Sequence, residues 1–401
     1  KHSFGTPRLR AKPNPQWQTI RKAGTILWLD TGDLEEATRL WSAEFEALTT
    51  NNTLLNKEVQ KGIYDSLVGG AANAIRQAAP DIDERTLVLE IAFFLNAYHA
   101  LRLVEQFDAN VSVELHTDLA NDAQKTFAYG RRYYDICPER FYIKVPLTPA
   151  GLLGARRLSR ANVPLNFTLG FSARQNHLIA LFSQPRYVNV FMGRLNAFVA
   201  DNKLGDGQNV GEKATLATQR ELLTLRRAGR SKSLLIGASM RDGSQVASLA
   251  GVDVFTMPPK VAAQFVQRPV AAVTPQVGRN PIVTTPPGIK LAEFAGQTLW
   301  DVPKPFKDAV DSLLKRGADG MTPDDIVSHF EMTGFRDFLP RWSEQDCARA
   351  AADGKIPVYA NWKDRLASGH VGLDALMNFS AFHSFASAQK ALDDRIRSLL
   401  G

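Results

Sequence analysis

The chain has 401 residues, of which 44% are hydrophobic and 22% charged, a balance that excludes a protein disordered throughout its length. Its two cysteines, Cys137 and Cys347, exclude a disulfide framework and a four-thiolate metal site, and they fit a reducing cytosol. The net charge of +7 is spread along the chain without interleaved aromatic residues, so we expect a local site for an anionic small molecule rather than nucleic-acid binding.

Residues 1–24 are predicted to form a solvated, basic N-terminal arm. The segment carries basic residues and prolines but no apolar core, so it is not a secretory signal, and Lys1 in place of Met leaves open a missing native start. No stretch of the sequence approaches the ~18 consecutive apolar residues of a membrane helix. We therefore expect a cytoplasmic protein without a membrane segment.

Strand-like runs alternate with helical patterns between residues 25 and 267. The expected strands are 25–30, 46–50, 110–116, 141–146, 164–171, 187–192, 233–239 and 252–258. Because parallel strands need such crossovers, the alternation predicts an α/β fold, the (β/α)8 TIM barrel. A doubly wound sheet is the alternative, although Thr31-Gly32-Asp33 after the first strand is not its usual glycine-rich fingerprint. The second crossover, 53–108, is predicted to hold three helices.

Residues 268–401 are predicted to form a linker and a C-terminal helical extension that packs on the barrel. The stretch 268–305 is rich in Pro, Val and Thr, which is typical of an irregular connection. Helical patterns follow at 306–316, 323–334, 343–352 and 372–400. The last of these carries Phe379, Phe382 and Phe385, which we interpret as core packing, with a cover over the barrel mouth as the alternative.

Polar residues share the inward face of several expected strands. These residues are Asp30, Asn51, Ser112, Glu114, His116, Lys144, Asn166 and Thr168. A lysine in the middle of an apolar strand is unfavourable unless it is paired or used, and a desolvated amine is a nucleophile that forms Schiff bases with carbonyls. The pattern alone leaves two interpretations of Lys144 open, a nucleophile and a structural ion pair with Glu114. His116 is expected to be a polar barrel-end residue rather than a functional one.

Residues 138–172, PERFYIKVPLTPAGLLGARRLSRANVPLNFTLGFS, resemble the Schiff-base segment of the transaldolase family. Six further blocks resemble that family in the same order: LWLD at Asp30, LTTNNTLL at Asn51, VSVELHTDLA at Glu114, VNVFMGR at Arg194, LLIGASMR at Ser239 and Arg241, and FTMPPKV at 255–261. The resemblance covers about 25–267. It implies a barrel whose fourth strand carries the lysine that forms the imine.

The resemblance also implies a reaction. A dihydroxyacetone unit would move from a ketose phosphate, such as sedoheptulose 7-phosphate or fructose 6-phosphate, to an aldose phosphate in the pentose phosphate pathway. No metal or organic cofactor would be needed, because the imine of Lys144 is the electron sink. Glu114 would act as acid and base through a bound water that Thr168 helps to hold. Asp30 would move the proton of the hydroxyl beside the breaking bond.

Further residues would bind the substrate, which is expected to be a phosphorylated sugar. By the same resemblance, Asn51, Asn166 and Ser239 would hold hydroxyl groups, and Arg194 and Arg241 would clamp the phosphate. Two positions depart from the family pattern. Asn52 stands where proline is usual, and Asn189 stands where a serine usually touches the phosphate.

Three alternatives to this reading remain open. The first is an enzyme like fructose 6-phosphate aldolase, which releases free dihydroxyacetone; that branch tends to have Gln and Tyr where this chain has Glu114 and Phe191. The second is a catalytically idle barrel kept as a scaffold. The third is a transferase of secondary metabolism with an unusual ketose donor. The sequence leaves a monomer and a homodimer equally open.

Overall fold

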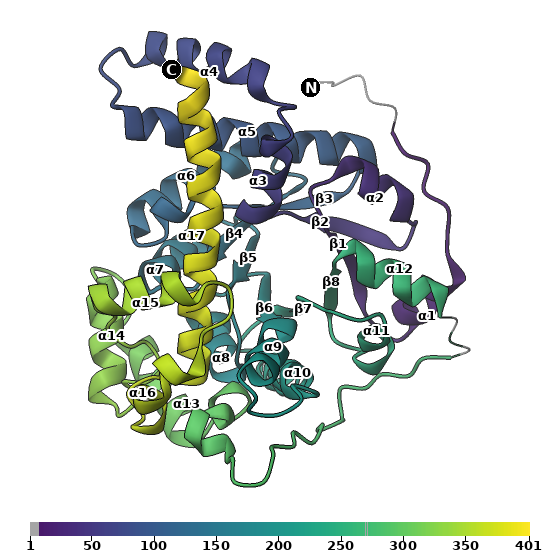
Figure 1. Ribbon diagram of the computed structural model, residues 1–401, viewed down its shortest axis with the longest axis vertical. Coiled ribbons are helices and arrows are strands. Elements are labelled where there is room, and N and C mark those ends of the chain that lie inside the picture. Colours follow the sequence, from purple (N-terminus) through teal and green to yellow (C-terminus); the bar gives the residue numbers. More distant parts are fainter. Residues whose placement is uncertain (1–7, 269, 271) are drawn as a thin grey trace.

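The computed structural model describes residues 8–268, 270 and 272–401, and its centre is a closed barrel of eight parallel strands (Figure 1). The strands are β1 Ile26–Asp30, β2 Phe45–Thr49, β3 Asn110–Glu114, β4 Phe141–Pro146, β5 Leu165–Thr168, β6 Tyr187–Phe191, β7 Leu234–Ala238 and β8 Val254–Met257. Each strand pairs with the next in sequence, and β8 closes on β1. The predicted (β/α)8 barrel is confirmed, and the doubly wound alternative is excluded.

The barrel interior changes from aromatic to polar along the strands. Near the start of β1, β4 and β6, the ring of Trp28 stacks on Tyr142 at 5.5 Å and meets Tyr187 edge-on at 4.7 Å. One step further along, the register places Lys144 between Glu114 on β3 and Asn166 on β5. The aromatic layer therefore closes the barrel beneath a polar layer at the carboxyl ends of the strands, where barrel enzymes carry their sites.

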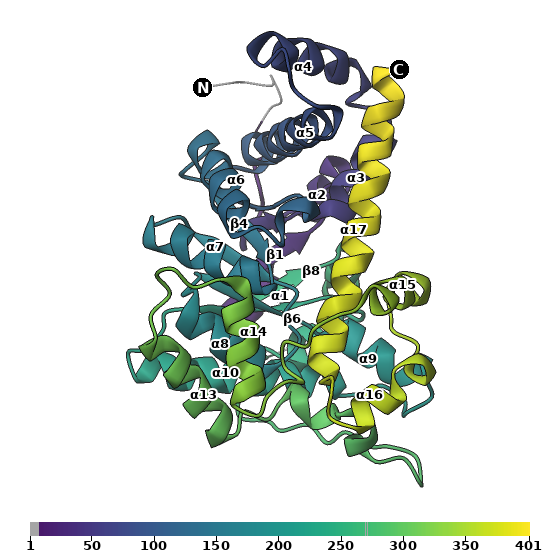
Figure 2. The same cartoon turned by 90° about the vertical axis from the view of Figure 1, so that its left-hand side faces the viewer.

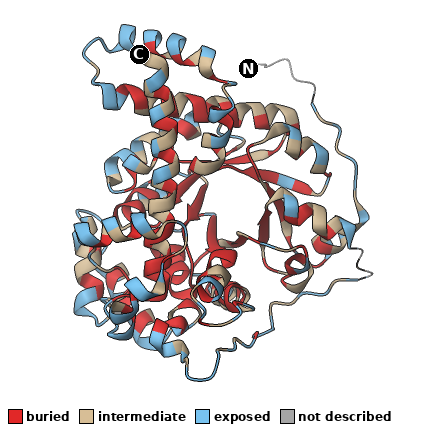
Figure 3. Cartoon of the chain, in the orientation of Figure 1, coloured by how far each residue is buried: buried red, intermediate tan, exposed pale blue. Residues whose placement is uncertain are grey.

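Helices surround the strands and make the crossovers (Figures 1 and 3). They are α2 Leu34–Leu40, α3 Asn52–Gln60, α4 Asp65–Ala78, α5 Glu84–Phe107, α6 Ala123–Ile136, α7 Pro149–Arg160, α8 Ala173–Phe182, α9 Met192–Asp201, α10 Val210–Arg227, α11 Ser244–Ser248 and α12 Pro259–Gln267, with a short 3-10 helix at Thr117–Leu119. The second crossover holds three helices, α3 to α5, as predicted. In length and composition α5 alone among the described helices could cross a membrane, but 56% of its most apolar window is buried inside the protein, so this is weak evidence.

The prediction of a solvated N-terminal arm is wrong for residues 15–22, which form helix α1, Pro15–Lys22. Its N-cap Asn14 accepts a hydrogen bond from the main-chain N–H of Gln16. Trp17 and Ile20, one helical turn apart, are buried, and the Trp17 ring lies 5.2 Å from Phe45 and 4.8 Å from Phe265. The basic residues of this segment concealed two apolar side chains at helical spacing.

The C-terminal region packs against one side and the mouth of the barrel (Figure 2). An irregular stretch with 3-10 helices at Leu291–Phe294 and Gly296–Leu299 leads to α13 Lys304–Lys315, α14 Pro323–Met332, α15 Glu344–Asp353, a 3-10 turn at Tyr359–Asn361, α16 Lys363–Ala367 and α17 Leu373–Leu400. The yellow helix α17 runs along the molecule and reaches α3, α4 and α5. Its Asn378 donates hydrogen bonds to the carbonyls of Leu147 and Leu169, so α17 lies over the carboxyl ends of β4 and β5.

Candidate active site

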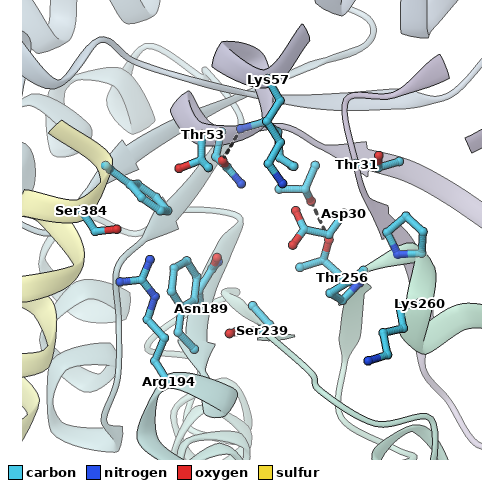
Figure 4. A pocket seen from close by; sticks show the side chains of 18 of the residues that line it. Asp30, Thr31, Thr53, Lys57, Asn189, Arg194, Ser239, Thr256, Lys260 and Ser384 are labelled. Carbon is cyan, nitrogen blue, oxygen red and sulfur yellow. Dashed lines mark hydrogen bonds between the residues drawn. The ribbon is translucent and has the colours of Figure 1, made fainter. Parts of the chain in front are cut away.

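A pocket of about 410 Å³ opens at the carboxyl end of the barrel (Figure 4). Most of the residues expected to form the site line it: Asp30, Asn51, Lys144, Asn189, Phe191, Arg194, Ser239 and Arg241. Glu114, Asn166 and Thr168 are buried directly behind them on β3 and β5. The structure therefore brings together residues that seven separate strands or strand ends contribute.

Lys144 is 2% exposed, and its side chain forms an ion pair with Glu114. The Nζ atom lies 3.2 Å from Glu114 Oε2 and 3.2 Å from the carbonyl oxygen of Thr50, and it faces the ring of Phe385 at 5.8 Å. Burial raises the pKa of Glu114 above its usual range, while the nearby Lys144 ammonium opposes that rise. The buried carboxyl group is therefore easier to protonate than an exposed glutamate.

Behind the lysine, an amide chain links three strands. Asn166 donates to the hydroxyl of Ser112 at 2.8 Å and accepts from the Asn189 amide at 2.7 Å. Asn189 lines the same pocket as the two arginines, and its amide group donates to Asn166 in the barrel interior. Next along β5, the hydroxyl of Thr168 is buried and has no hydrogen-bond partner in the described residues. This hydroxyl is free to hold a small polar molecule.

Asp30 ends β1 at the pocket wall. Burial raises its pKa to about 6, and the positive charges of Lys144, Lys57 and Arg241 oppose the rise. Its Oδ1 atom is buried without a hydrogen-bond partner in the described part of the chain. A carboxyl group of this kind can exchange a proton near neutral pH. Across the pocket mouth, Lys57 extends from α3 toward Asp30 (Figure 4).

Asn51 serves two purposes at the start of α3. Its side-chain oxygen accepts a hydrogen bond from the main-chain N–H of Leu54 at 2.9 Å, which caps the helix. The side chain also lines the pocket. Asn51 is therefore a helix cap, and its side chain is also accessible to a ligand in the pocket.

Arg194 lies in the first turn of α9, directly after β6, and Arg241 lies in the loop after β7. Arg194 is buried, and its burial together with repulsion from Arg241 lowers its pKa to about 10. Gly193 makes the close approach of the two segments possible, because a Cβ atom there would lie 2.1 Å from the carbonyl oxygen of Ser239. Ser239 has a left-handed φ of 63°, which turns the chain after β7 toward the pocket.

Several residues that line the pocket were not singled out from the sequence. Lys57 and Lys260 add positive charge, and Thr256 donates or accepts a hydroxyl hydrogen bond with Thr49 at 2.8 Å. Lys355 comes from the C-terminal region, as does Phe385, which the sequence had indicated as a candidate cover over the barrel mouth. The Phe385 spacing on the last helix was a usable signal, whereas no pattern marks Lys355.

His116 and Asn52 contact α17 instead of the pocket. His116 Nε2 lies 3.2 Å from the Asp393 carboxylate, and the Asn52 amide donates to Gln389 Oε1 at 2.6 Å. Gln389 in turn donates to Asp393 at 2.9 Å. These residues form a buried polar cluster that joins the last helix to the barrel. Within the described residues, no group of three or more His, Cys, Asp or Glu side chains is placed to hold a metal ion.

Known proteins similar to this chain point to one family. A family model described as Transaldolase/Fructose-6-phosphate aldolase matches residues 27–342, which is most of the chain. The transaldolase of Xanthomonas euvesicatoria pv. vesicatoria (strain 85-10) is 28% identical over 244 residues, covering 59% of this chain and 73% of that protein. The transaldolase of Stutzerimonas stutzeri (strain A1501) is 27% identical over 253 residues, covering 61% and 77%. The chain therefore belongs to the transaldolase/fructose-6-phosphate aldolase family and is an enzyme of the transaldolase type.

Proposed function

We propose that this enzyme transfers a dihydroxyacetone unit from a ketose phosphate to an aldose phosphate through an imine on Lys144. One observation carries the proposal. A buried lysine that is ion-paired with a buried carboxyl group lies in a pocket whose mouth carries cationic side chains without an ion-pair partner among the described residues. Imine formation needs a deliverable proton beside the amine, and a sugar phosphate needs cations at the mouth.

Imine formation is assigned to Lys144 and Glu114. The neutral amine attacks the ketone carbon of the donor, the carbonyl oxygen is protonated, and it leaves as water. Glu114, 3.2 Å from Nζ and with a raised pKa, is suited to give that proton and to take it back during hydrolysis. The buried, partnerless hydroxyl of Thr168 supports the proposal that a bound water relays it.

Carbon–carbon cleavage is assigned to Asp30. Its carboxylate takes the proton of the donor hydroxyl beside the breaking bond, the aldose phosphate leaves, and the electron pair is delocalised into the protonated imine. Attack of this three-carbon enamine on a new aldose phosphate returns the proton from Asp30. The pKa of about 6 supports proton transfer in both directions near neutral pH.

Substrate recognition is assigned to the remaining predicted residues. Asn51, Asn166 and Ser239 are proposed to bind hydroxyl groups of the three-carbon unit, and Arg194 and Arg241 are proposed to bind the phosphate. Asn189 is proposed to orient Asn166 through their 2.7 Å hydrogen bond. Because Asn189 replaces the usual serine, the donor site differs from the family pattern. Transfer from an unusual ketose donor is therefore the second candidate function.

Transfer, rather than release of free dihydroxyacetone, is favoured by the residues around Lys144. Glu114 and Phe191 are the side chains expected for transfer, and the ring of Phe385 lies beside both Lys144 and Phe191. An apolar cover that excludes water protects the enamine until the acceptor arrives. An aldolase acting on fructose 6-phosphate is the alternative.

Further properties belong to the same proposal. The substrates are phosphorylated sugars of the pentose phosphate pathway, and no metal or organic cofactor takes part. We propose a barrel domain at 25–267 and a C-terminal extension at 268–401 in a cytoplasmic protein. Analytical ultracentrifugation will decide between a monomer and a homodimer.

Covalent trapping tests the proposal directly. Borohydride added with fructose 6-phosphate should attach a three-carbon unit to the peptide that contains Lys144, as measured by mass spectrometry. Lys144→Met should abolish both labelling and transfer. Lys304→Met, at an exposed lysine that does not line the pocket, should change neither. Labelling of another lysine would contradict the assignment of Lys144.

The acceptor dependence of the reaction separates transfer from release. With fructose 6-phosphate alone, we expect little free dihydroxyacetone until an aldose phosphate is added. A rapid release without acceptor would assign the enzyme to the aldolase branch. In either case, Glu114→Gln should lower the rate of imine formation while the far-ultraviolet circular dichroism stays unchanged.

A further inference from the structure

The pocket mouth holds more positive charge than two arginines supply. Lys57, Arg194, Arg241, Lys260 and Lys355 all line it. Across the described residues, none of these five lies within ion-pair distance of a carboxylate, whereas Arg132, Arg140 and Arg226 each pair with one. Cations that gather without counter-charges repel one another, so the free pocket is prepared for an anionic ligand.

Lys355 differs from the other four in origin. It lies in the turn after α15, beyond the residues 27–342 that the family model matches. Its main-chain carbonyl accepts a hydrogen bond from Arg194 Nη1 at 3.3 Å, so the turn rests on one of the two arginines of the site. Its Nζ atom has no hydrogen-bond partner in the described part of the chain, and the side chain is exposed at the pocket mouth.

The turn is fixed to the barrel before any ligand binds. Asp353 accepts hydrogen bonds from the main-chain N–H of Val358 and the indole N–H of Trp362. Asn202, at the end of α9, donates to the carbonyl of Pro357 at 2.9 Å and accepts from the N–H of Tyr359 at 2.7 Å. Since α9 also carries Arg194, the positions of Lys355 and Arg194 are set by one element. A cation held in this way loses little freedom when it binds a ligand.

The charges around Lys355 also favour an anion. Partial burial and repulsion from Arg194, Arg241 and Lys57 lower the pKa of Lys355 to about 8, while Asp30 opposes the change. A phosphate dianion at this place would replace repulsion by attraction and would favour the ammonium form. In the free enzyme, the ammonium form is lost as the pH rises through about 8.

We propose that Lys355 is a third phosphate-binding residue, which acts beside Arg194 and Arg241 to make the enzyme prefer phosphorylated sugars. This inference rests on the proposed function for the identity of the sugar. The binding of a phosphate anion at Lys355 does not depend on it. The C-terminal region thereby supplies part of the substrate specificity as well as an apolar cover.

The test compares Lys355→Met and Lys355→Arg with Lys363→Met, a control at an exposed lysine of the same region. Lys355→Met should raise KM for fructose 6-phosphate about three- to tenfold, since one exposed charge-assisted contact is lost. KM for fructose and kcat for both sugars should stay the same. Lys355→Arg should restore KM, and Lys363→Met should behave as the unmodified enzyme.

The pH profile and phosphate binding complete the test. KM for fructose 6-phosphate should rise between pH 7 and pH 9 in the unmodified enzyme, and the rise should be smaller in Lys355→Arg. Titration calorimetry with inorganic phosphate should show weaker binding to Lys355→Met, even if no imine forms on Lys144. Unchanged phosphate binding, or equal KM changes for fructose and fructose 6-phosphate, would overturn the assignment of Lys355 regardless of the reaction catalysed.

Discussion

The pairing of Lys144 with Glu114 supports the proposed nucleophile only through the surroundings of the pair. An inward lysine on an apolar strand fits a structural ion pair and a nucleophile equally well, and the ion pair is present. What distinguishes the site is its surroundings. The lysine faces a pocket, and the carboxyl group beside it has a raised pKa. A purely structural pair gains from full charge on both partners, whereas a raised carboxyl pKa favours exchange of the proton.

Asp30 is expected to contribute to catalysis while lowering stability. Asp30→Asn should abolish cleavage, because an amide cannot take the proton of the donor hydroxyl. A rise in the pKa from 3.8 to about 6 corresponds to about 3 kcal/mol of destabilisation when the group is charged. Because the folded state holds the proton more tightly, this destabilisation is complete above pH 6 and disappears as the pH falls toward 4.

Urea unfolding of Asp30→Asn at pH 8 and at pH 4 measures this effect. The variant should be the more stable protein at pH 8 and should differ little at pH 4. If Asp30→Asn gains the same free energy of unfolding at pH 8 and at pH 4, the buried charge of Asp30 is not the source of the gain.

The two arginines should discriminate between sugars with and without phosphate. Arg194→Ala or Arg241→Ala should raise KM for fructose 6-phosphate roughly ten- to a hundredfold, as expected for one charge-assisted contact. KM for fructose should hardly change. Equal losses on both sugars would indicate that the arginines support the loops instead of the substrate.

At the scale of elements, the strands and a candidate cover could be predicted, but the contacts that hold the last helix could not. Alternating side chains mark each strand within a few residues, so the polar layer of the barrel followed from the sequence. The contacts of α17 follow no local pattern. Asn52 meets Gln389 across 337 residues of chain, and the turn that holds Lys355 is set by Asn202 on α9. The sequence showed that Asn52 replaces the usual proline, but it did not show that Asn52 binds Gln389.

The polar cluster beneath α17 should hold Phe385 over the pocket. Gln389→Ala removes the acceptor of the buried Asn52 amide and should lower the free energy of unfolding by about 1–3 kcal/mol. A looser cover should also increase the release of dihydroxyacetone without acceptor. Ser387→Ala, at an exposed position on the same helix, serves as the control. If Gln389→Ala is destabilised but releases dihydroxyacetone at the wild-type rate, the polar cluster does not hold Phe385 over the pocket.

For the whole molecule, one buried ion pair joins the C-terminal region to the barrel. Arg174 on α8 binds Asp374 at 2.7 Å and Asp337 at 2.8 Å, and Asp374 also accepts a hydrogen bond from Ser172. Asp374 is completely buried. The fold class and the extension were predictable from strand count and composition, but this connection depends on side chains about 200 residues apart that no periodicity relates.

Arg174→Met should therefore destabilise the entire protein. It leaves the buried Asp374 carboxylate without its cation, which should lower the free energy of unfolding by about 3–5 kcal/mol. Arg160→Met breaks an exposed pair with Asp319, another contact between the barrel and the C-terminal region, and should change stability by less than about 1 kcal/mol. Urea unfolding of both variants measures the difference. A similar effect for the two would show that burial of the pair is unimportant.

The position of α17 at the end of the sequence also orders events during biosynthesis. The eight strands and Lys144 leave the ribosome before Lys355 and Phe385 have been made. Until α17 is made, the pocket lacks Phe385, whose ring faces Lys144. On the proposed function, a chain interrupted before α17 would therefore lack the apolar cover of its nucleophile.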